Sequence, residues 1–429
     1  MPCYTLLLMT RFIPLLFACA ASAQVLVLND VNLIDGTGAA ARPHMRIVIQ
    51  GERIAAVEDA SKGFLSTGAD VRDMKGMTVI PGLMDAHVHL TSGPGDQEQI
   101  AKTLRFGLLG GVTSVRDMGG DNIVLAALAK KAADNNQAAP RIYYSTLVAG
   151  PQWFADPRPK ASSHGGVAGE VAWMRAITPQ SDFPAVIAAG KATGATGLKI
   201  YADLDADTIM KVTAEAHKQG LKVWAHSSVF PAKPSEVIVD PVDVVSHSVY
   251  LGAEGMNPPV PSYEAARRGQ GIDYSKSPIN SITMLTVLRL MEDMGTILDE
   301  TLFVTNASKR GDDDPIWLWT VAITRKAHHD GVPLAAGTDS FGSPNKDAEP
   351  NIHREMELLV EQCGLTPIEA IRAATYNGAR TVGMEKSYGT VEAGKIADLV
   401  ILRDDPSTDI KRTRDIFAVI KGGIIYQRP

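Results

Sequence analysis

Short apolar runs with alternating polar positions occupy both ends of the chain. Residues 25–79 and 389–426 show this pattern, and turn residues such as Asp35-Gly36-Thr37-Gly38 separate the runs. Alternation with a period of two is typical of strands that bury one face. Neither end has enough strands to close a core alone, so we expect both ends to pair into one small β-sandwich.

The middle of the chain alternates short apolar strands with helical stretches, which is the pattern of βα units around a parallel sheet. The expected strands are 83–90, 112–117, 142–148, 198–201, 223–226, 244–248, 302–305 and 334–339. Eight such units predict a TIM barrel. The expected fold class is therefore α/β, a (β/α)8 TIM barrel with a small β-sandwich domain built from both termini.

Helix signals lie between these strands. The segments 205–219 and 321–330 each end before a glycine, and Thr366-Pro367-Ile368-Glu369 has the sequence of a capping box. Two connections, 149–166 and 249–281, exceed the usual loop length. In a barrel these connections lie at the carboxyl ends of the strands, where substrates bind.

The expected domain boundaries follow from these patterns. A first part of the β-sandwich covers 24–80, the catalytic barrel covers 81–385, and the second part of the sandwich covers 386–429. The remaining segment, 1–23, is expected to be a signal peptide.

Composition and charge narrow the class of protein. The 429 residues are 45% hydrophobic and 21% charged, which excludes general disorder. The formal net charge is −6, so no basic surface for nucleic acid is expected. Three cysteines, Cys3, Cys19 and Cys363, are too few for a disulfide framework. The composition is that of an enzyme held together by packing.

Residues 11–23 carry a positive charge, a short apolar run and an Ala-Ser-Ala ending, which are the parts of a secretory signal. Cleavage after Ala23 would export a chain that begins at Gln24, to the periplasm or the medium. The apolar run is far shorter than the roughly 20 residues that span a bilayer, and no later segment supplies a span.

Two alternatives concern the same segment. Met9, followed by Thr10 and Arg11, is a more usual start for a signal than Met1. The four residues that end at Cys19 resemble a lipoprotein cleavage box, but the bulky Phe17 occupies a position where a small residue is usual. Lipid anchoring at Cys19 is therefore the second interpretation.

Candidate chemistry gathers at the ends of the predicted strands. His87 and His89 end the first barrel strand, and alternation points both side chains into the barrel mouth. Four more polar residues end other strands of the barrel, and these are Lys199, His226, His247 and Asp339. Carboxyl ends of barrel strands meet over one axis, so the six side chains predict a metal site.

This set of residues resembles that of the amidohydrolase superfamily. The motifs that carry the resemblance are Pro81-Gly82-Leu83-Met84-Asp85-Ala86-His87-Val88-His89, Lys199, His226, His247, Gly337-Thr338-Asp339 and Gly394-Lys395-Ile396-Ala397-Asp398-Leu399-Val400. The resemblance covers essentially the whole mature chain. It implies two divalent metal ions, with zinc expected, and a homo-oligomer, which in such proteins can be an octamer.

The resemblance also implies how the ligands divide. One ion is held by His87, His89 and Asp339, the other by His226 and His247, and an N6-carboxylated Lys199 bridges both. A free ammonium would be repelled by two cations, whereas a lysine that loses its proton can add carbon dioxide and become an anionic ligand. The alternative is that Lys199 remains a cation paired with Asp203.

The expected reaction follows from this centre. Two metal ions lower the pKa of a shared water, hydroxide attacks the amide carbonyl, and Asp339 passes the proton to the leaving nitrogen. His164, in the connection after the third strand, is the candidate for a hydrogen bond to the carbonyl or its oxyanion. A loop histidine without a catalytic role is the alternative for His164.

Substrate contacts are predicted from position. Tyr201 lies two residues after Lys199 and faces the same side, Trp153 offers an aromatic wall, and Arg267 with Arg268 offers a carboxylate clamp. The alternative for Tyr201 is a tyrosine that packs in the core. The alternative for Arg267 and Arg268 is exposed charge on a loop.

Within the superfamily the chain is most similar to the branch of imidazolonepropionase-like proteins, Xaa-Pro dipeptidases and ochratoxin-hydrolysing amidases. The branch implies cleavage of an amide that joins an acyl or aminoacyl group to a C-terminal amino acid, such as ochratoxin A to ochratoxin α plus phenylalanine. The alternatives are an Xaa-Pro dipeptidase and a cyclic-amide hydrolase or deaminase. His226-Ser227-Ser228-Val229 lacks the Glu that deaminases place three residues after this histidine. A non-enzymatic barrel would have lost ligands, and none is missing.

Overall fold

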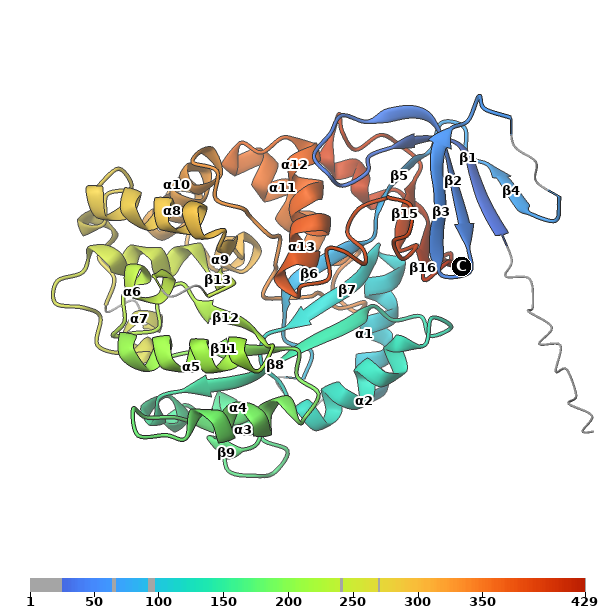
Figure 1. The fold of residues 1–429 in the computed structure, drawn as a ribbon. Helices are drawn as coiled ribbons and strands as arrows, with labels where there is room; N and C mark the ends of the chain where they lie inside the picture. The colour runs from blue at the N-terminus through green and yellow to red at the C-terminus, as the bar shows by residue number, and fades with distance from the viewer. Residues whose placement is uncertain (1–24, 64–66, 92–96, 240–241, 269–270, 429) are drawn as a thin grey trace, which may run out of the picture.

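The computed structural model describes residues 25–63, 67–91, 97–239, 242–268 and 271–428. The expected signal peptide lies outside the described residues, and so do Cys3 and Cys19. Within the described ranges, no helix is long and apolar enough to cross a membrane. Figure 1 shows a large helix-covered barrel with a separate sheet at one end.

The separate sheet contains strands from both ends of the chain (Figure 1). Its order is β17-β16-β15-β5-β1-β2-β3, with β4 beside β1. The bounds are β1 Val25–Leu33, β2 Arg42–Gln50, β3 Arg53–Asp59, β4 Asp70–Asp73, β5 Thr78–Pro81, β15 Leu399–Leu402, β16 Ile416–Lys421 and β17 Ile424–Tyr426. Antiparallel pairing of β15 with β5 joins the two ends. The expected β unit from both termini is confirmed, and hydrogen bonds join its strands into one sheet.

Seven parallel strands of the described chain form a nearly closed barrel. In order they are β6 Leu83–Val88, β7 Val112–Asp117, β8 Arg141–Ala149, β11 Gly197–Ile200, β12 Lys222–His226, β13 Val244–Ser246 and β14 Ile297–Asp299. The short strands β9 Glu170–Val171 and β10 Met174–Ala176 extend the sheet beside β8. The predicted fold class, an α/β barrel with a β domain from the termini, is confirmed.

The remaining side of the barrel is closed by residues 334–339. Ala335 N donates to Leu298 O, and Ala86 N donates to Ala336 O, both at 2.9 Å. This segment therefore lies between β14 and β6, although its only ladder contact among the described residues is a bridge from Leu334 to Leu298. The expected eighth strand at 334–339 is thus correctly placed, but it is not a regular strand.

The expected seventh strand at 302–305 is wrong. These residues lie in helix α9, Leu302–Ser308, and the strand is β14, Ile297–Asp299. The apolar run after Thr301 has the pattern of a strand but forms a helix. Its first backbone N–H groups, on Leu302 and Phe303, donate to the buried Glu355 carboxylate instead of to a neighbouring strand. The real strand is only three residues long and ends in an acidic residue, so its hydrophobic pattern is weak.

Helices cover the outside of the barrel (Figure 1). They are α1 Gln97–Leu109, α2 Asn122–Ala133, α4 Phe183–Lys191, α5 Ala206–Lys218, α6 Pro234–Ile238, α8 Ile282–Met294, α10 Pro315–His329, α11 Ile352–Cys363, α12 Pro367–Arg372 and α13 Gly378–Thr381. Asp205 caps α5 by accepting a hydrogen bond from Thr208 N at 2.8 Å, and Thr366 with Glu369 forms the predicted capping box of α12.

The two long connections fold over the mouth of the barrel. The first contains a 3-10 helix, Pro151–Ala155, and α3, Arg158–Ala161. The second contains a 3-10 helix, Ser248–Gly255, then α7, Tyr263–Arg267, and the 3-10 turn Tyr274–Lys276. Side chains from both connections share one apolar cluster, whose members include Trp153, Trp173, Met256 and Tyr263. This cluster forms a wall beside the strand ends.

Candidate metal centre

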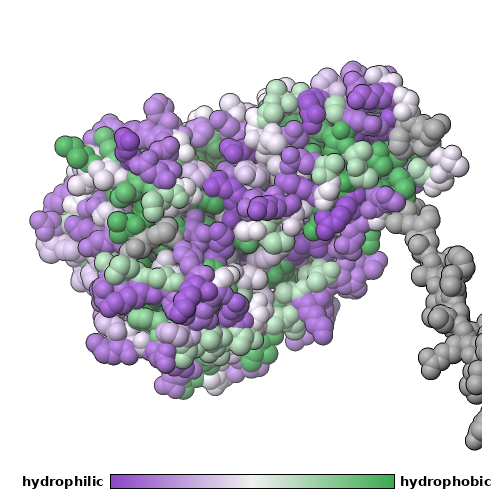
Figure 2. All heavy atoms as spheres, in the orientation of Figure 1, coloured by the Kyte–Doolittle hydropathy of each residue, from purple (hydrophilic) through white to green (hydrophobic). Residues whose placement is uncertain are grey.

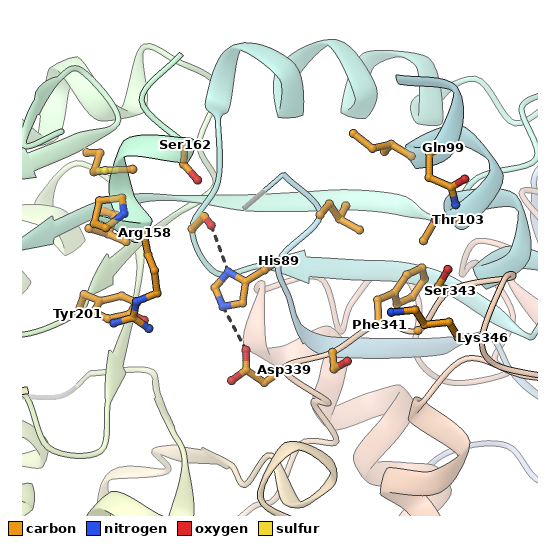
Figure 3. A pocket seen from close by; sticks show the side chains of 18 of the residues that line it. His89, Gln99, Thr103, Arg158, Ser162, Tyr201, Asp339, Phe341, Ser343 and Lys346 are labelled. Atoms are coloured by element: carbon orange, nitrogen blue, oxygen red, sulfur yellow. Dashed lines mark hydrogen bonds and ion pairs between the residues drawn. The ribbon is translucent and has the colours of Figure 1, made fainter. Parts of the chain in front are cut away.

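Three predicted ligands converge where β6 meets the closing segment. His89 Nε2 lies 3.2 Å from Asp339 Oδ1, and His87 Nε2 lies 3.6 Å from the same oxygen (Figure 3 shows His89 and Asp339). The ligand atoms of the three residues lie within 4.8 Å of one another. Asp339 N donates to His87 O at 2.9 Å, which fixes Asp339 in a left-handed conformation with φ 52°. The backbone thus points its carboxylate at both imidazoles.

The other two predicted histidines continue this arrangement. The His247 ring centroid lies 4.9 Å from that of His87 and 4.8 Å from that of His226. His226 ends β12, and His247 directly follows β13. The buried Nδ1 of His226 has no hydrogen-bond partner among the described residues. A buried ring nitrogen without a partner suits a metal ligand.

Lys199 lies in β11 and is fully buried. Its Nζ finds no hydrogen-bond partner in the described part of the chain. Burial, and secondly the nearby charge of Arg116, lowers the pKa of this amine to about 7. The neutral amine is therefore populated near neutral pH, unlike that of an exposed lysine.

The electrostatics of the site favour metal binding. Burial lowers the pKa of His247 to about 3 and holds the pKa of His226 well below its usual range. These imidazoles are therefore neutral, which is the form that binds metal. Burial opposes ionisation of Asp339, but the neighbouring His87 and His89 side chains outweigh it and lower the pKa of Asp339. Neutral imidazoles and a carboxylate are a donor set for a divalent cation.

A buried carboxylate that the sequence analysis missed orients His87. Asp299 Oδ2 lies 2.6 Å from His87 Nδ1, and it accepts hydrogen bonds from Arg116 Nη2 and Ser246 Oγ, both at 2.9 Å. A carboxylate can only accept a hydrogen bond, so Nδ1 of His87 must carry the proton. The lone pair of His87 therefore lies on Nε2, which faces Asp339. The run Ile297-Leu298-Asp299 could have predicted an acidic residue at the end of a strand. It was overlooked because the seventh strand was expected at 302–305.

A cavity of about 680 Å³ opens beside the centre (Figure 3). Its lining includes His89, Asp339, Trp153 and Tyr201, so two of the predicted substrate residues lie beside the predicted ligands. The Tyr201 ring centroid is 4.3 Å from that of His226 and 4.4 Å from that of Trp153. The cavity therefore joins an aromatic wall to the candidate metal ligands.

Three other predicted residues lie elsewhere. Arg267 and Arg268 both pair with Glu264, and they line a neighbouring cavity of about 390 Å³ that shares Trp153 with the first. His164 Nδ1 lies 2.6 Å from Asp121 Oδ2, and the His164 side chain is 49% exposed. None of the three is among the described residues that line the Asp339 cavity.

The chain belongs to the amidohydrolase family, whose pattern matches residues 78–240 and 320–426. Over 460 residues it is 25% identical to the ochratoxinase of Aspergillus niger, covering 97% of this chain and 89% of that protein. It is 28% identical to the imidazolonepropionase of Symbiobacterium thermophilum, covering 87% and 85% of the two chains. This membership confirms the expected superfamily and an enzyme of the hydrolase class. Such hydrolases are generally metal-dependent, and the His87, His89 and Asp339 group is a fitting site.

Solved structures share the fold. A Xaa-Pro dipeptidase with bound methionine in its active site superposes with a TM-score of 0.74 at 22% identity, covering 94% of this chain and 100% of that one. The Aspergillus niger ochratoxinase superposes with a TM-score of 0.73 at 20% identity, covering 95% and 96%. The fold therefore extends over nearly the whole described chain.

Proposed function

We propose that the protein is a binuclear metal-dependent amidohydrolase that cleaves N-acyl amino acids or dipeptides, with ochratoxin A as the specific candidate substrate. The observation that carries the proposal is the continuous arrangement of four histidines and Asp339, together with the buried amine of Lys199, which acts electrostatically on His87, His226 and His247. His87, His89 and Asp339 would hold one ion, and His226 with His247 would hold the other. When bound, two divalent ions lower the pKa of water and polarise the amide carbonyl.

Lys199 supplies the bridging ligand in this proposal. Its neutral amine attacks the carbon of carbon dioxide and loses a proton, which leaves a carbamate anion on Nζ. Complete burial and the unpartnered Nζ support this step, because an ammonium there would be neither solvated nor paired. The alternative pairing of Lys199 with Asp203 finds no support, since Asp203 accepts from Tyr263 N at 2.9 Å.

Asp339 moves the proton. Its carboxylate faces the cavity, and its lowered pKa keeps it ionised when a water attacks the carbonyl. It accepts the proton of that water and returns it to the leaving amide nitrogen, so the amine departs neutral.

The aromatic wall supports the substrate class. Trp153 and Tyr201 offer apolar surface to the acyl or amino-acid part of the substrate. The names of two similar proteins, ochratoxinase and Xaa-Pro dipeptidase, point to amide-containing substrates. The imidazolonepropionase relative makes a cyclic amide the second candidate substrate.

A hydrolysis screen of the purified mature chain tests the proposal. The panel contains ochratoxin A, N-acyl amino acids, Xaa-Pro dipeptides and a cyclic amide, each with and without a chelator. We expect chelator-sensitive release of a free amino acid from the first three groups. Cleavage of the cyclic amide alone would replace this function by the second candidate, and chelator-resistant cleavage would refute metal dependence.

A further inference from the structure

Arg158 lies at the aromatic end of the cavity that contains Asp339 (Figure 3). It is the first residue of α3, in the long connection after β8. Its side chain is 45% exposed, and its guanidinium carbon lies 5.6 Å from the ring centroid of Tyr263. Arg158 already pairs with Asp156, so a substrate anion would have to bind the part of the guanidinium that Asp156 leaves open.

Asp156 fixes the orientation of this guanidinium. Arg158 Nε lies 3.0 Å from Asp156 Oδ1, and Nη2 lies 2.7 Å from Asp156 Oδ2. These two bonds occupy one edge of a planar group that has five N–H donors. The side chain also hydrogen-bonds Tyr263, and the N–H donors that remain for a ligand are held in place before the ligand arrives.

Tyr201 connects Arg158 to the reacting centre. The Tyr201 ring lies 4.3 Å from that of His226 and 5.4 Å from that of Tyr263, which in turn lies under Arg158. A substrate that extends from the candidate metal ligands over Tyr201 would bring a group next to the scissile amide toward Arg158.

We propose that Arg158 binds the carboxylate of the amino acid that leaves, while Trp153, Tyr201 and Tyr263 receive its side chain. This inference rests on the proposed function and makes the substrate an N-acyl derivative of an aromatic or bulky apolar amino acid with a free carboxylate. Arginine pairs with planar carboxylates through two parallel hydrogen bonds, and the aromatic walls favour an apolar side chain.

The chain offers matched controls. Arg267 lies in the neighbouring cavity beyond Trp153 and is paired with Glu264. Lys346 is a second cation among the described residues that line the cavity of Arg158 and Asp339, and it lies at the end away from Arg158 (Figure 3). Arg267→Gln tests a nearby arginine outside the cavity, and Lys346→Gln tests the opposite orientation of the substrate.

Steady-state kinetics test the proposal with N-acetyl-L-phenylalanine and its carboxamide, which removes only the negative charge. Arg158→Gln should raise KM for the acid about 10- to 100-fold, the range for a lost charged hydrogen bond, and leave the carboxamide unchanged. Arg158→Lys should restore part of the loss, Arg267→Gln should behave like the wild type, and Lys346→Gln should change the rates for the acid and the carboxamide to the same extent. Equal effects on acid and carboxamide, or a loss confined to Lys346→Gln, would overturn the assignment.

Calorimetric titration with L-phenylalanine separates this inference from the proposed function, because it needs no turnover. We expect binding to the wild type and to Arg267→Gln, and binding weakened at least about 10-fold in Arg158→Gln. Absence of binding to the wild type, or equal binding to Arg158→Gln, would overturn the inference. Binding without any hydrolysis in the panel would instead refute the proposed function and retain the carboxylate subsite.

Discussion

Three of the four imidazoles of the centre, those of His87, His89 and His247, take their orientation from a partner behind the ring. His87 Nδ1 faces the Asp299 carboxylate, His89 Nδ1 lies 3.1 Å from Gly119 O, and His247 Nδ1 lies 2.9 Å from Thr301 Oγ1. Bonds at Nδ1 leave Nε2 for the cavity side. These contacts explain how residues from distant strands present one type of nitrogen to a common point.

Removing the charge behind His87 should weaken metal binding. Asp299→Asn leaves the buried Arg116 without its anion and no longer requires a proton on His87 Nδ1. We expect metal affinity to fall about 10- to 100-fold, as for other residues that orient a ligand, with a lower melting temperature. Competition with a chelator measures the affinity. Asp243→Asn, which removes a carboxylate paired with His217 and Lys222, is the control, and an equal metal loss there would contradict this role.

Asp339 has two roles that one substitution can separate. Asp339→Asn keeps an oxygen donor but removes the base, so metal should largely remain while turnover falls by about 10²- to 10⁴-fold. Elemental analysis and hydrolysis of an N-acyl amino acid, with circular dichroism for the fold, measure both effects. Retained metal with nearly wild-type turnover would show that another group moves the proton.

At the scale of elements, the candidate metal ligands lie at the carboxyl ends of the barrel strands, and the long connections supply side chains that line the cavity. The sequence predicted the ligand positions because apolar strands with a polar residue at or just before the carboxyl end recur at β6, β11 and β12. It could not predict Asp299, because β14 is three residues long and is followed directly by a second buried acid, Glu300. Arg158 was missed because its role depends on how two connections pack together, which no periodic pattern encodes.

The packing of the first connection against the segment that follows β11 depends on a glycine. A Cβ on Gly150 would lie 1.9 Å from Asp203 O, while Gly150 N donates to Ala202 O at 2.8 Å. Gly150→Ala should therefore displace the 3-10 helix that holds Trp153, lowering kcat/KM by at least about 10-fold and costing roughly 1–3 kcal/mol of stability. Gly63→Ala, where a Cβ would meet nothing within 4 Å, is the control. Equal melting temperatures and activities for both variants would refute this dependence.

At the scale of the whole molecule, the terminal sheet is tied to the barrel. Arg141, the first residue of β8, bonds the Asp398 carboxylate through Nε at 3.2 Å and Nη2 at 3.1 Å. Asp398 also accepts from Gly422 N at 2.7 Å, so one carboxylate joins the barrel to the strands of the C-terminal end. A homo-oligomer, with an octamer as one possible size, stays a prediction.

Export remains a prediction of the sequence. Because residues 11–23 have the composition of a secretory signal, protein exported by a bacterial host should lack everything up to Ala23. Intact-mass analysis measures the new N-terminus. A retained segment would refute export, and a mass that fits an acylated Cys19 would favour the lipoprotein alternative.

The central claim is a two-ion centre that needs the carboxylated Lys199. Elemental analysis of the metal bound per chain, in the wild type and in Lys199→Ala, tests it most directly. We predict about two ions per wild-type chain and loss of most metal from the variant, with partial recovery when a short carboxylic acid replaces the missing bridge. Full metal occupancy in Lys199→Ala without added acid would contradict the account.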